Sequence, residues 1–386
     1  MQGWEKKMEK VVKIERIPQE VDDYYSDDDI FNINSWGADL SFRELITMYQ
    51  EGELAKPELQ RYYVWDKTEA SRFIESLLLG LPVPSIFLAR GKREQKLIID
   101  GYQRIMTVYD YVRGIFSKDN KVFKLSNTTK INSRWRGKAF SELEEPEKRR
   151  INSYTIHAII FEQKHPKDSD TSLYQIFERI NTTGRTLTTQ EIRNCAYQGP
   201  FNTLLFELNR NKEWRELYGS LEVDSRMRDI EFILRFIALA ESDLTILQEA
   251  QNQISMKKFL NDFMGSKESN SQANLDKWQQ KFIKTIAYIH NNIGVHAFQN
   301  IASKDHLKYV NRFHPTIFDS VACATSIALE QQPNINIPDL ENKRIELLKN
   351  DTFADLIYTR TTNVDRIIAR IVMALKYLYN IENYHE

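Results

Sequence analysis

A predicted strand meets a predicted helix at Ile99-Asp100-Gly101-Tyr102-Gln103-Arg104. The strand covers residues 96–99, and Gly114 follows the helix in the place of a C-terminal glycine. Arg104 lies in the first turn of this helix. Backbone N–H groups and the helix dipole favour negative charge at such a position. The turn is therefore a candidate site for a phosphate or another anion.

The same turn has a simpler interpretation as helix punctuation. Asp100 and Gln103 have the Asp-x-x-Gln spacing of a capping box, in which Asp100 is the N-cap and Gly101 eases the turn. The functional interpretation adds that Arg104 directs its guanidinium toward the anion that the turn binds. The two interpretations are compatible, because a capped strand-to-helix turn is also the framework of a phosphate loop.

A second turn that carries an arginine lies at Ile180-Asn181-Thr182-Thr183-Gly184-Arg185-Thr186-Leu187. Gly184 suits a left-handed backbone position, and Thr188 and Glu191 have the spacing of a capping box for the next helix. Helix punctuation explains these residues but does not require Arg185. We therefore expect the two arginine-bearing turns to converge on one anionic ligand.

Hydrophobic periodicity divides the chain into an α+β half and an all-helical half. We predict an acidic arm over residues 1–34, an α+β domain over 35–200 and a helical domain over 201–386. Thr68 is the predicted cap of the second helix. The helices and strands expected in the first half are 41–49, 68–79, 85–90, 96–99, 154–161 and 171–180; the clearest helices of the second half are 228–239, 275–293, 315–329 and 364–378.

Composition narrows the class of protein. The 386 residues are 41% hydrophobic and 11% aromatic, which is enough for packed cores and argues against disorder. The 53 Lys and Arg nearly balance the 54 Asp and Glu, so any DNA contact must come from a local patch. Two cysteines give no disulfide framework or zinc pattern, and no apolar run is long enough for a membrane span. We expect a cytoplasmic protein that does not contact a membrane.

One short basic cluster has the ingredients of a nucleic-acid contact. Arg134, Arg136 and Lys138 supply cations, and Trp135 supplies a ring on which a base can stack. The alternative is an ordinary solvated surface. In the last helix, Arg366 and Arg370 lie one turn apart, opposite the predicted apolar stripe, and allow the same two interpretations.

Three ordered motifs resemble one known family. They are residues 59–65 (Leu-Gln-Arg-Tyr-Tyr-Val-Trp), residues 98–104 and residues 177–194. Together they resemble the "domain of unknown function 262" family, the N-terminal domain of GmrSD-type modification-dependent restriction enzymes and related phage-defence proteins. The resemblance spans residues 35–200. It implies a fold similar to ParB and sulfiredoxin, and nucleotide hydrolysis that controls DNA cleavage.

The resemblance also implies roles for individual residues. Asn181 matches an asparagine that helps to hold magnesium, and catalysis falls to Asp100, Gln103 and Asn181. Tyr102 departs from the family pattern, which has a glutamine there, so hydrolysis is expected to be slow or lost while binding persists. The implied nucleotide-binding residues are Gln60, Arg61, Asp100, Gly101, Tyr102, Gln103, Arg104, Asn181, Thr183, Gly184 and Arg185.

Three functions follow, in this order. The first is a sensor or switch of an anti-phage defence system that binds a nucleoside triphosphate with Mg²⁺, hydrolyses it and acts on DNA, with nuclease activity supplied by a partner protein; self-assembly is also expected. The second is a non-hydrolysing DNA-binding or assembly module of the same fold. The third is an autonomous nuclease, for which His290-Asn291-Asn292 with His296 is the nearest approach to an HNH motif, without the expected strands.

Overall fold

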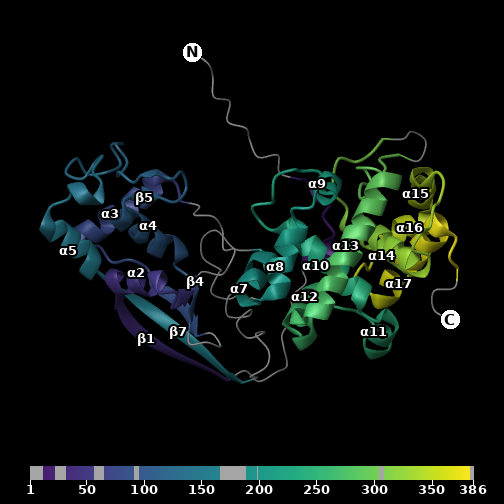
Figure 1. Ribbon diagram of the computed structural model, residues 1–386, viewed down its shortest axis with the longest axis horizontal. Coiled ribbons are helices and arrows are strands. Elements are labelled where there is room, and N and C mark those ends of the chain that lie inside the picture. Colours follow the sequence, from purple (N-terminus) through teal and green to yellow (C-terminus); the bar gives the residue numbers. More distant parts are fainter. Residues whose placement is uncertain are drawn as a thin grey trace, which may run out of the picture. The chain divides into compact units, whose positions relative to one another are not determined.

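The computed structural model describes residues 12–21, 32–55, 65–90, 95–165, 188–197, 199–303 and 308–382. The chain divides into two compact units (Figure 1). One, here called the N-terminal unit, is Asp28–Gln198, and the other, here called the helical unit, combines Met1–Asp27 with Gly199–Glu386. The protein is thus a mixed α+β domain with a helical C-terminal region.

A five-stranded mixed sheet organises the N-terminal unit, with the strand order β1-β7-β3-β4-β2. Strand β1 (Asn32–Ser41) is antiparallel to β7 (Thr155–His165), and β7 is parallel to β3 (Ile86–Arg90). Strand β4 (Lys96–Asp100) is antiparallel to β3 and parallel to the short β2 (Leu54–Ala55). The predicted strands at 85–90, 96–99 and 154–161 are confirmed, whereas β1 and β2 were not expected.

Strand β7 shows how the sheet separates its two faces. Ile156, Ala158 and Ile160 alternate along the strand and are at most 4% exposed. The intervening His157 lies on the opposite face, where its Nδ1 is 2.8 Å from Oδ1 of Asp39 on β1. One face of the sheet therefore packs under helices, as the alternation requires.

Local capping explains where the helices of this unit begin. Ser41 caps the first long helix and Asp66 caps the second, each in a capping box. Asp66 replaces the predicted cap Thr68, whose own N–H donates to the Asp66 carboxylate at 2.7 Å. Helix 171–180 lies outside the described residues. The helices are α2 (Phe42–Gln50), α3 (Lys67–Leu79), α4 (Tyr102–Arg113), the short η1 (Phe140–Glu142), α5 (Glu145–Ser153) and α7 (Thr189–Ala196), and a hairpin of β5 (Ile115–Phe116) and β6 (Lys121–Val122) follows α4.

The helical unit packs around one central helix. Helix α14 has buried residues along its whole length, including Ile317, Val321 and Ala324, each fully buried. Its neighbours are α10, α13 and α17 (Figure 1). The described residues of this unit form α8 (Pro200–Leu208), α9 (Lys212–Tyr218), α10 (Arg228–Glu241), α11 (Leu244–Ala250), α12 (Met256–Gly265), η2 (Lys267–Asn270), α13 (Gln272–Asn292), α14 (Pro315–Gln331), α15 (Leu340–Lys349), α16 (Asp351–Leu356), α17 (Val364–Ala374) and η3 (Leu375–Tyr379).

The segment 12–21, which lies within the predicted arm, packs with the helical unit. The Glu15 N–H donates to the carbonyl of Phe313, and the Phe313 N–H donates to the carbonyl of Lys13, both at 2.8 Å. The segment ends in the short helix α1 (Pro18–Val21), whose Glu20 forms an ion pair with Arg235 at 2.6 Å. This part of the predicted arm is therefore structural.

A network of buried charges holds this junction together. Both Arg235 and Arg370 donate to the carboxylate of Asp319, at 2.5 and 3.1 Å, and Arg235 also donates to Glu20. Arg370 and Asp319 are fully buried. The interpretation of Arg370 as a surface residue opposite the apolar stripe is wrong, because Arg370 turns inward to a carboxylate on α14. The buried Arg370 guanidinium also donates to the carbonyl of Thr361 at 2.7 Å.

His314 beside this network predicts a pH dependence of stability. It is 1% exposed, and burial, together with nearby Arg370, lowers the pKa of its imidazole to about 3, although Glu20 acts in the opposite direction. The unfolded chain therefore binds a proton below pH ~6.5 that the folded chain does not. The stability that the protein has above pH ~6.5 with His314 neutral therefore decreases as the pH falls toward 3.

We expect His314 to lower the free energy of unfolding by about 2 kcal/mol when the pH falls from 7 to 5. The measurement is chemical denaturation of wild type and His314→Phe at both pH values, since phenylalanine keeps an aromatic ring against Tyr358 but cannot titrate. The wild type should lose about that much more stability than the variant. Parallel losses in the two proteins would contradict the assignment.

Candidate functional site

Gly101 shapes the turn between β4 and α4. Its φ is +101°, a left-handed conformation that glycine adopts at little cost. A Cβ atom at this position would also lie 2.3 Å from Cγ2 of Ile86 on β3, so the turn lies directly against the neighbouring strand. The glycine of the motif is therefore required by backbone conformation and by close packing together.

An ion pair closes the turn. The guanidinium of Arg104 donates to the carboxylate of Asp100, four residues earlier. The same guanidinium donates to the carbonyls of Pro84 at 2.8 Å and Ser85 at 3.1 Å, at the start of β3. The Arg104 side chain is 12% exposed and that of Asp100 is 53% exposed. Arg104 thus braces the turn against β3, and Asp100 is its half-exposed carboxylate.

The predicted Asp100–Gln103 capping box is wrong. The N-cap of α4 is Gly101, so Asp100 does not take that position. The reason is competition, because Arg104 takes the Asp100 carboxylate as an i,i+4 ion partner. Helices α2 and α3 of the same unit do begin with capping boxes. The start of α4 therefore differs from these two helices in having a glycine as its N-cap residue.

Gln103 joins two of the three motifs. Its Oε1 accepts a hydrogen bond from the backbone N–H of Trp65 at 3.3 Å. Trp65 is the last residue of the motif over 59–65, and its ring packs on Phe73 of α3. Gln60 and Arg61 of that motif lie outside the described residues. Sequence reasoning missed the contact, although a polar residue in the first turn that does not cap its own helix is a signal for such a bond.

Tyr102, the departure from the family pattern, is a core residue. It is 7% exposed, and its hydroxyl is hydrogen-bonded to the hydroxyl of Tyr49 at the end of α2. Burial raises the pKa of Tyr102, with the neighbouring Tyr49 and Asp110 adding to the effect. The phenol is therefore held neutral inside the unit.

Only the end of the third motif is described. Thr188 caps α7, and Glu191 completes the predicted capping box. Farther along the helix, Arg193 is 1% exposed and donates to the side-chain oxygen of Gln190 at 3.0 Å. The candidate residues Asn181, Thr183, Gly184 and Arg185 lie outside the described residues, so the expected convergence of the two turns stays a prediction.

The predicted nucleic-acid cluster is mostly occupied by contacts within the unit. Trp135 is 5% exposed, and its Nε1 donates to Glu147 at 2.8 Å. Arg134 pairs with the same carboxylate, also at 2.8 Å, and Arg136 donates to the carbonyl of Ile131. The backbone of Lys138 accepts from Tyr111. Base stacking on Trp135 would require the ring to leave the core.

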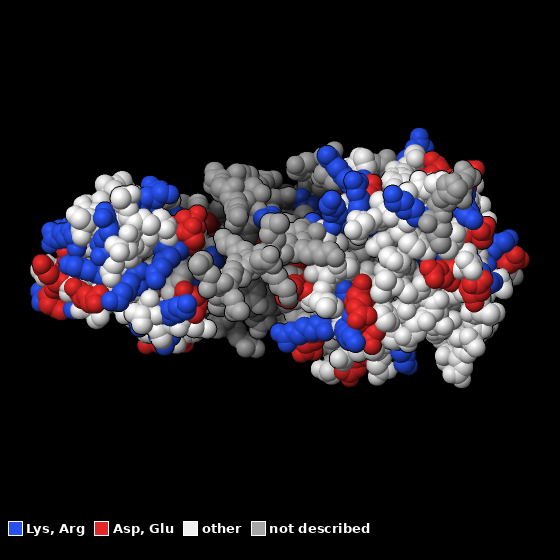
Figure 2. Space-filling view, turned by 90° about the horizontal axis from the view of Figure 1, so that it is seen from above, with Lys and Arg blue, Asp and Glu red and all other residues white. Residues whose placement is uncertain are grey.

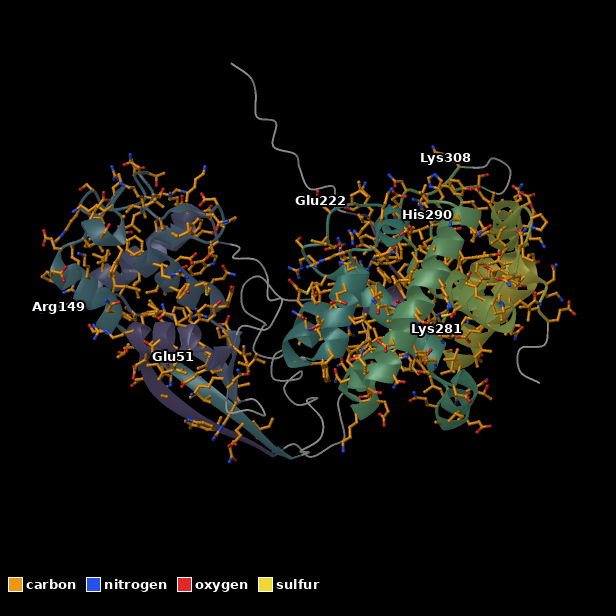
Figure 3. All side chains as sticks on the ribbon, in the orientation of Figure 1. Glu51, Arg149, Glu222, Lys281, His290 and Lys308 are labelled. Atoms are coloured by element: carbon orange, nitrogen blue, oxygen red, sulfur yellow. The ribbon has the colours of Figure 1, made fainter. Side chains whose placement is uncertain are left out.

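The histidines of the nuclease hypothesis are also engaged. Nε2 of His290, which is labelled in Figure 3, lies 2.7 Å from Glu216 on α9. The ring of His296 stacks on Tyr309. Among the described residues, no three His, Cys, Asp or Glu side chains come together as a metal site. Mg²⁺ commonly uses one or two carboxylates together with substrate phosphates, and Asp100 fits that requirement at the turn.

The fold and the turn define a mixed α+β domain that carries an arginine-braced strand-to-helix turn, joined to a helical region. Residues 42–198 match the family model described as "GmrSD restriction endonuclease, N-terminal domain", so this part of the chain is similar to GmrSD N-terminal domains. The match indicates a restriction-type, defence-related protein. No curated protein and no solved structure matches the chain. Within the described residues, no helix has both the length and the apolar character that crossing a membrane requires.

Proposed function

We propose that the N-terminal unit binds a nucleoside triphosphate with Mg²⁺ at the turn before α4 and acts as the sensor or switch of a restriction-type defence system that acts on DNA. The observation that carries the proposal is the start of α4 at Gly101. Its N-cap residue is a glycine, its first turn contains the basic residue Arg104, and it lies beside the half-exposed Asp100. Helix starts of this kind favour phosphate groups.

Each described residue then has a role. Gly101 lets the backbone approach β3 and places the helix start, and Gln103 ties the turn to Trp65 of the first motif. Arg104 supplies positive charge beside the helix start, while Asp100 holds its guanidinium in position and offers a carboxylate to Mg²⁺. Arg61 and Arg185 are proposed to neutralise further phosphates, and Asn181 to help hold the metal.

The test is nucleotide-induced stabilisation in Arg104→Ala. A triphosphate with Mg²⁺ at about 100 times its Kd should stabilise the wild type by about 2.7 kcal/mol. Each protein is compared with its own ligand-free form by thermal shift, which separates binding from the bracing that Arg104 gives to β3. At the same nucleotide concentration, Arg104→Ala should lose most of this nucleotide-induced stabilisation.

The matched control is Arg113→Ala. Arg113 is the last residue of the same helix, is exposed, and donates to the hydroxyl of Tyr109. It should keep the full nucleotide gain. Equal gains in wild type and Arg104→Ala would refute the proposed site.

A second function, a non-hydrolysing DNA-binding or assembly module, is favoured by one observation. The Tyr102 hydroxyl is buried against Tyr49 and does not replace the glutamine of the family pattern. Phosphate release, measured with and without DNA, separates the two functions. Nucleotide binding without release under either condition would favour the module over the hydrolase.

A further inference from the structure

The chain between α4 and η1 carries a strong local excess of positive charge. Residues 113–138 contain eight Lys and Arg and one acidic residue, in a protein whose net charge is -1. Figure 2 shows Lys and Arg side chains gathered over the N-terminal unit. Here the segment 113–138 is called the basic hairpin segment, because it contains the β5–β6 hairpin.

The underside of this segment is anchored in the core. Phe116 and Phe123 are at most 3% exposed, and their ring centroids are 4.8 Å apart. The buried Asp110 of α4 accepts from the backbone N–H of Ser117 at 2.7 Å and from its hydroxyl at 2.5 Å. Burial raises the pKa of Asp110, which these hydrogen bonds offset in part. The hairpin is therefore held in one position on the unit.

The outer side of the segment is cationic and partly apolar. Ile115 and Val122 lie directly opposite each other in the hairpin and are 50% and 59% exposed. Lys121 and Lys130 are exposed, and neither forms an ion pair with any residue that the structure describes. Their charge is thus not neutralised within the described part of the unit.

We propose that the basic hairpin segment is a contact surface for the phosphate backbone of duplex DNA. The proposal rests on the proposed function only in taking DNA as the partner, and it does not require nucleotide binding. Duplex DNA carries about one negative charge per 1.7 Å of its axis, which complements a concentrated group of lysines. A two-stranded ribbon also fits the major groove, where Ile115 and Val122 would meet apolar edges.

The aromatic residues of the segment favour a duplex over a single strand. Proteins that hold single strands stack bases on exposed rings. Here the rings of Phe116, Phe123 and Trp135 are all at most 5% exposed. Binding through phosphates therefore fits the surface better than base stacking, and we expect little sequence preference.

The experiment measures the Kd of full-length protein for a duplex of random sequence between 50 and 200 mM salt. Each lysine that contacts a phosphate contributes about 0.9 to the slope of log Kd against log salt. Lys121→Gln/Lys130→Gln should bind more weakly, with a slope smaller by about 1.8. The loss of affinity over this salt range should shrink by about tenfold.

The matched control is Lys284→Gln/Lys308→Gln, which removes the same charge from two exposed lysines of the helical unit (Lys308 is labelled in Figure 3). It should leave the slope unchanged. A third variant, Ile115→Ser/Val122→Ser, should weaken binding with an unchanged slope, because apolar contacts release no counterions. Thermal unfolding of each variant shows that it is folded.

The outcomes separate this inference from the proposed function. Equal salt slopes in wild type and the Lys121/Lys130 variant would overturn the proposed DNA-contact surface. An equal decrease of the slope in the Lys284/Lys308 control would also overturn it. Absence of DNA binding with nucleotide binding intact would overturn the surface alone. DNA binding with the predicted slopes but without nucleotide binding would support the surface and refute the nucleotide site. Binding to acidic vesicles or protein in place of DNA would also overturn it.

Discussion

Replacing Asp319 with alanine should destabilise the helical unit by about 3–5 kcal/mol, the usual cost of removing one partner from a buried ion pair. Asp319 is fully buried and accepts from two guanidinium groups, those of Arg235 and Arg370. Without Asp319, both guanidinium charges stay in the interior. Glu20 then pairs with Arg235 but not with Arg370. Chemical denaturation followed by far-UV circular dichroism measures the loss.

The matched control for this change is Asp355→Ala. Asp355 also accepts from an arginine, Arg366, but its side chain is 57% exposed. Removal of an exposed partner should cost much less, because water screens the charges of such a pair. A similar cost for the two alanine variants would show that the buried network contributes no more than a surface pair.

The second large effect is expected for Gly101→Ala. The left-handed φ of +101° costs a residue with a Cβ about 1–2 kcal/mol, and the overlap with Ile86 at 2.3 Å adds about 1–3 kcal/mol. We expect a total loss of about 2–5 kcal/mol in the stability of the N-terminal unit. Denaturation measurements give the loss, and nucleotide-induced stabilisation should fall with it if the turn is the binding site.

Gly114 provides the control at the other end of the same helix. Its φ of +80° is also left-handed, but a Cβ at this position would meet no atom within 4 Å, so Gly114→Ala isolates the backbone cost. Gly101→Ala and Ile86→Ala should together cost less than the sum of the two single changes, because Ile86→Ala removes the methyl group that overlaps the new Cβ. Equal losses of stability in Gly101→Ala and Gly114→Ala would mean that β3 moves away from the new Cβ with no loss of stability.

Sequence patterns predicted the elements around the site well. The strand before Asp100, the helix after it and the glycine that ends that helix were all confirmed, because alternation and capping depend on residues close in the chain. The partner of the Asp100 carboxylate was predicted wrongly. A capping box and an i,i+4 ion pair compete for this carboxylate. The carbonyls of Pro84 and Ser85, which hold Arg104 in place, come from the segment just before β3, far from Arg104 in the chain.

The same limit explains Trp135 and Arg370. A tryptophan between arginines has the composition of a nucleic-acid contact, yet Glu147 of α5 draws its indole N–H into the core. Arg370 lies on the polar side of a helix by periodicity, yet Asp319 of α14 makes that side an interior one. In both cases the deciding partner is a carboxylate on another element, and periodicity carries no information about it.

By itself, the sequence determined the α+β and helical halves, the capping box of α7 and the likeness to GmrSD N-terminal domains. These depend on interactions within a few residues or on motifs read in order. Tertiary structure alone decided that residues 12–21 join the helical unit, that Arg104 braces β3, and which cations stay exposed. The physical reason is that a charged side chain takes the partner that packing brings near it, and packing joins residues far apart in the chain.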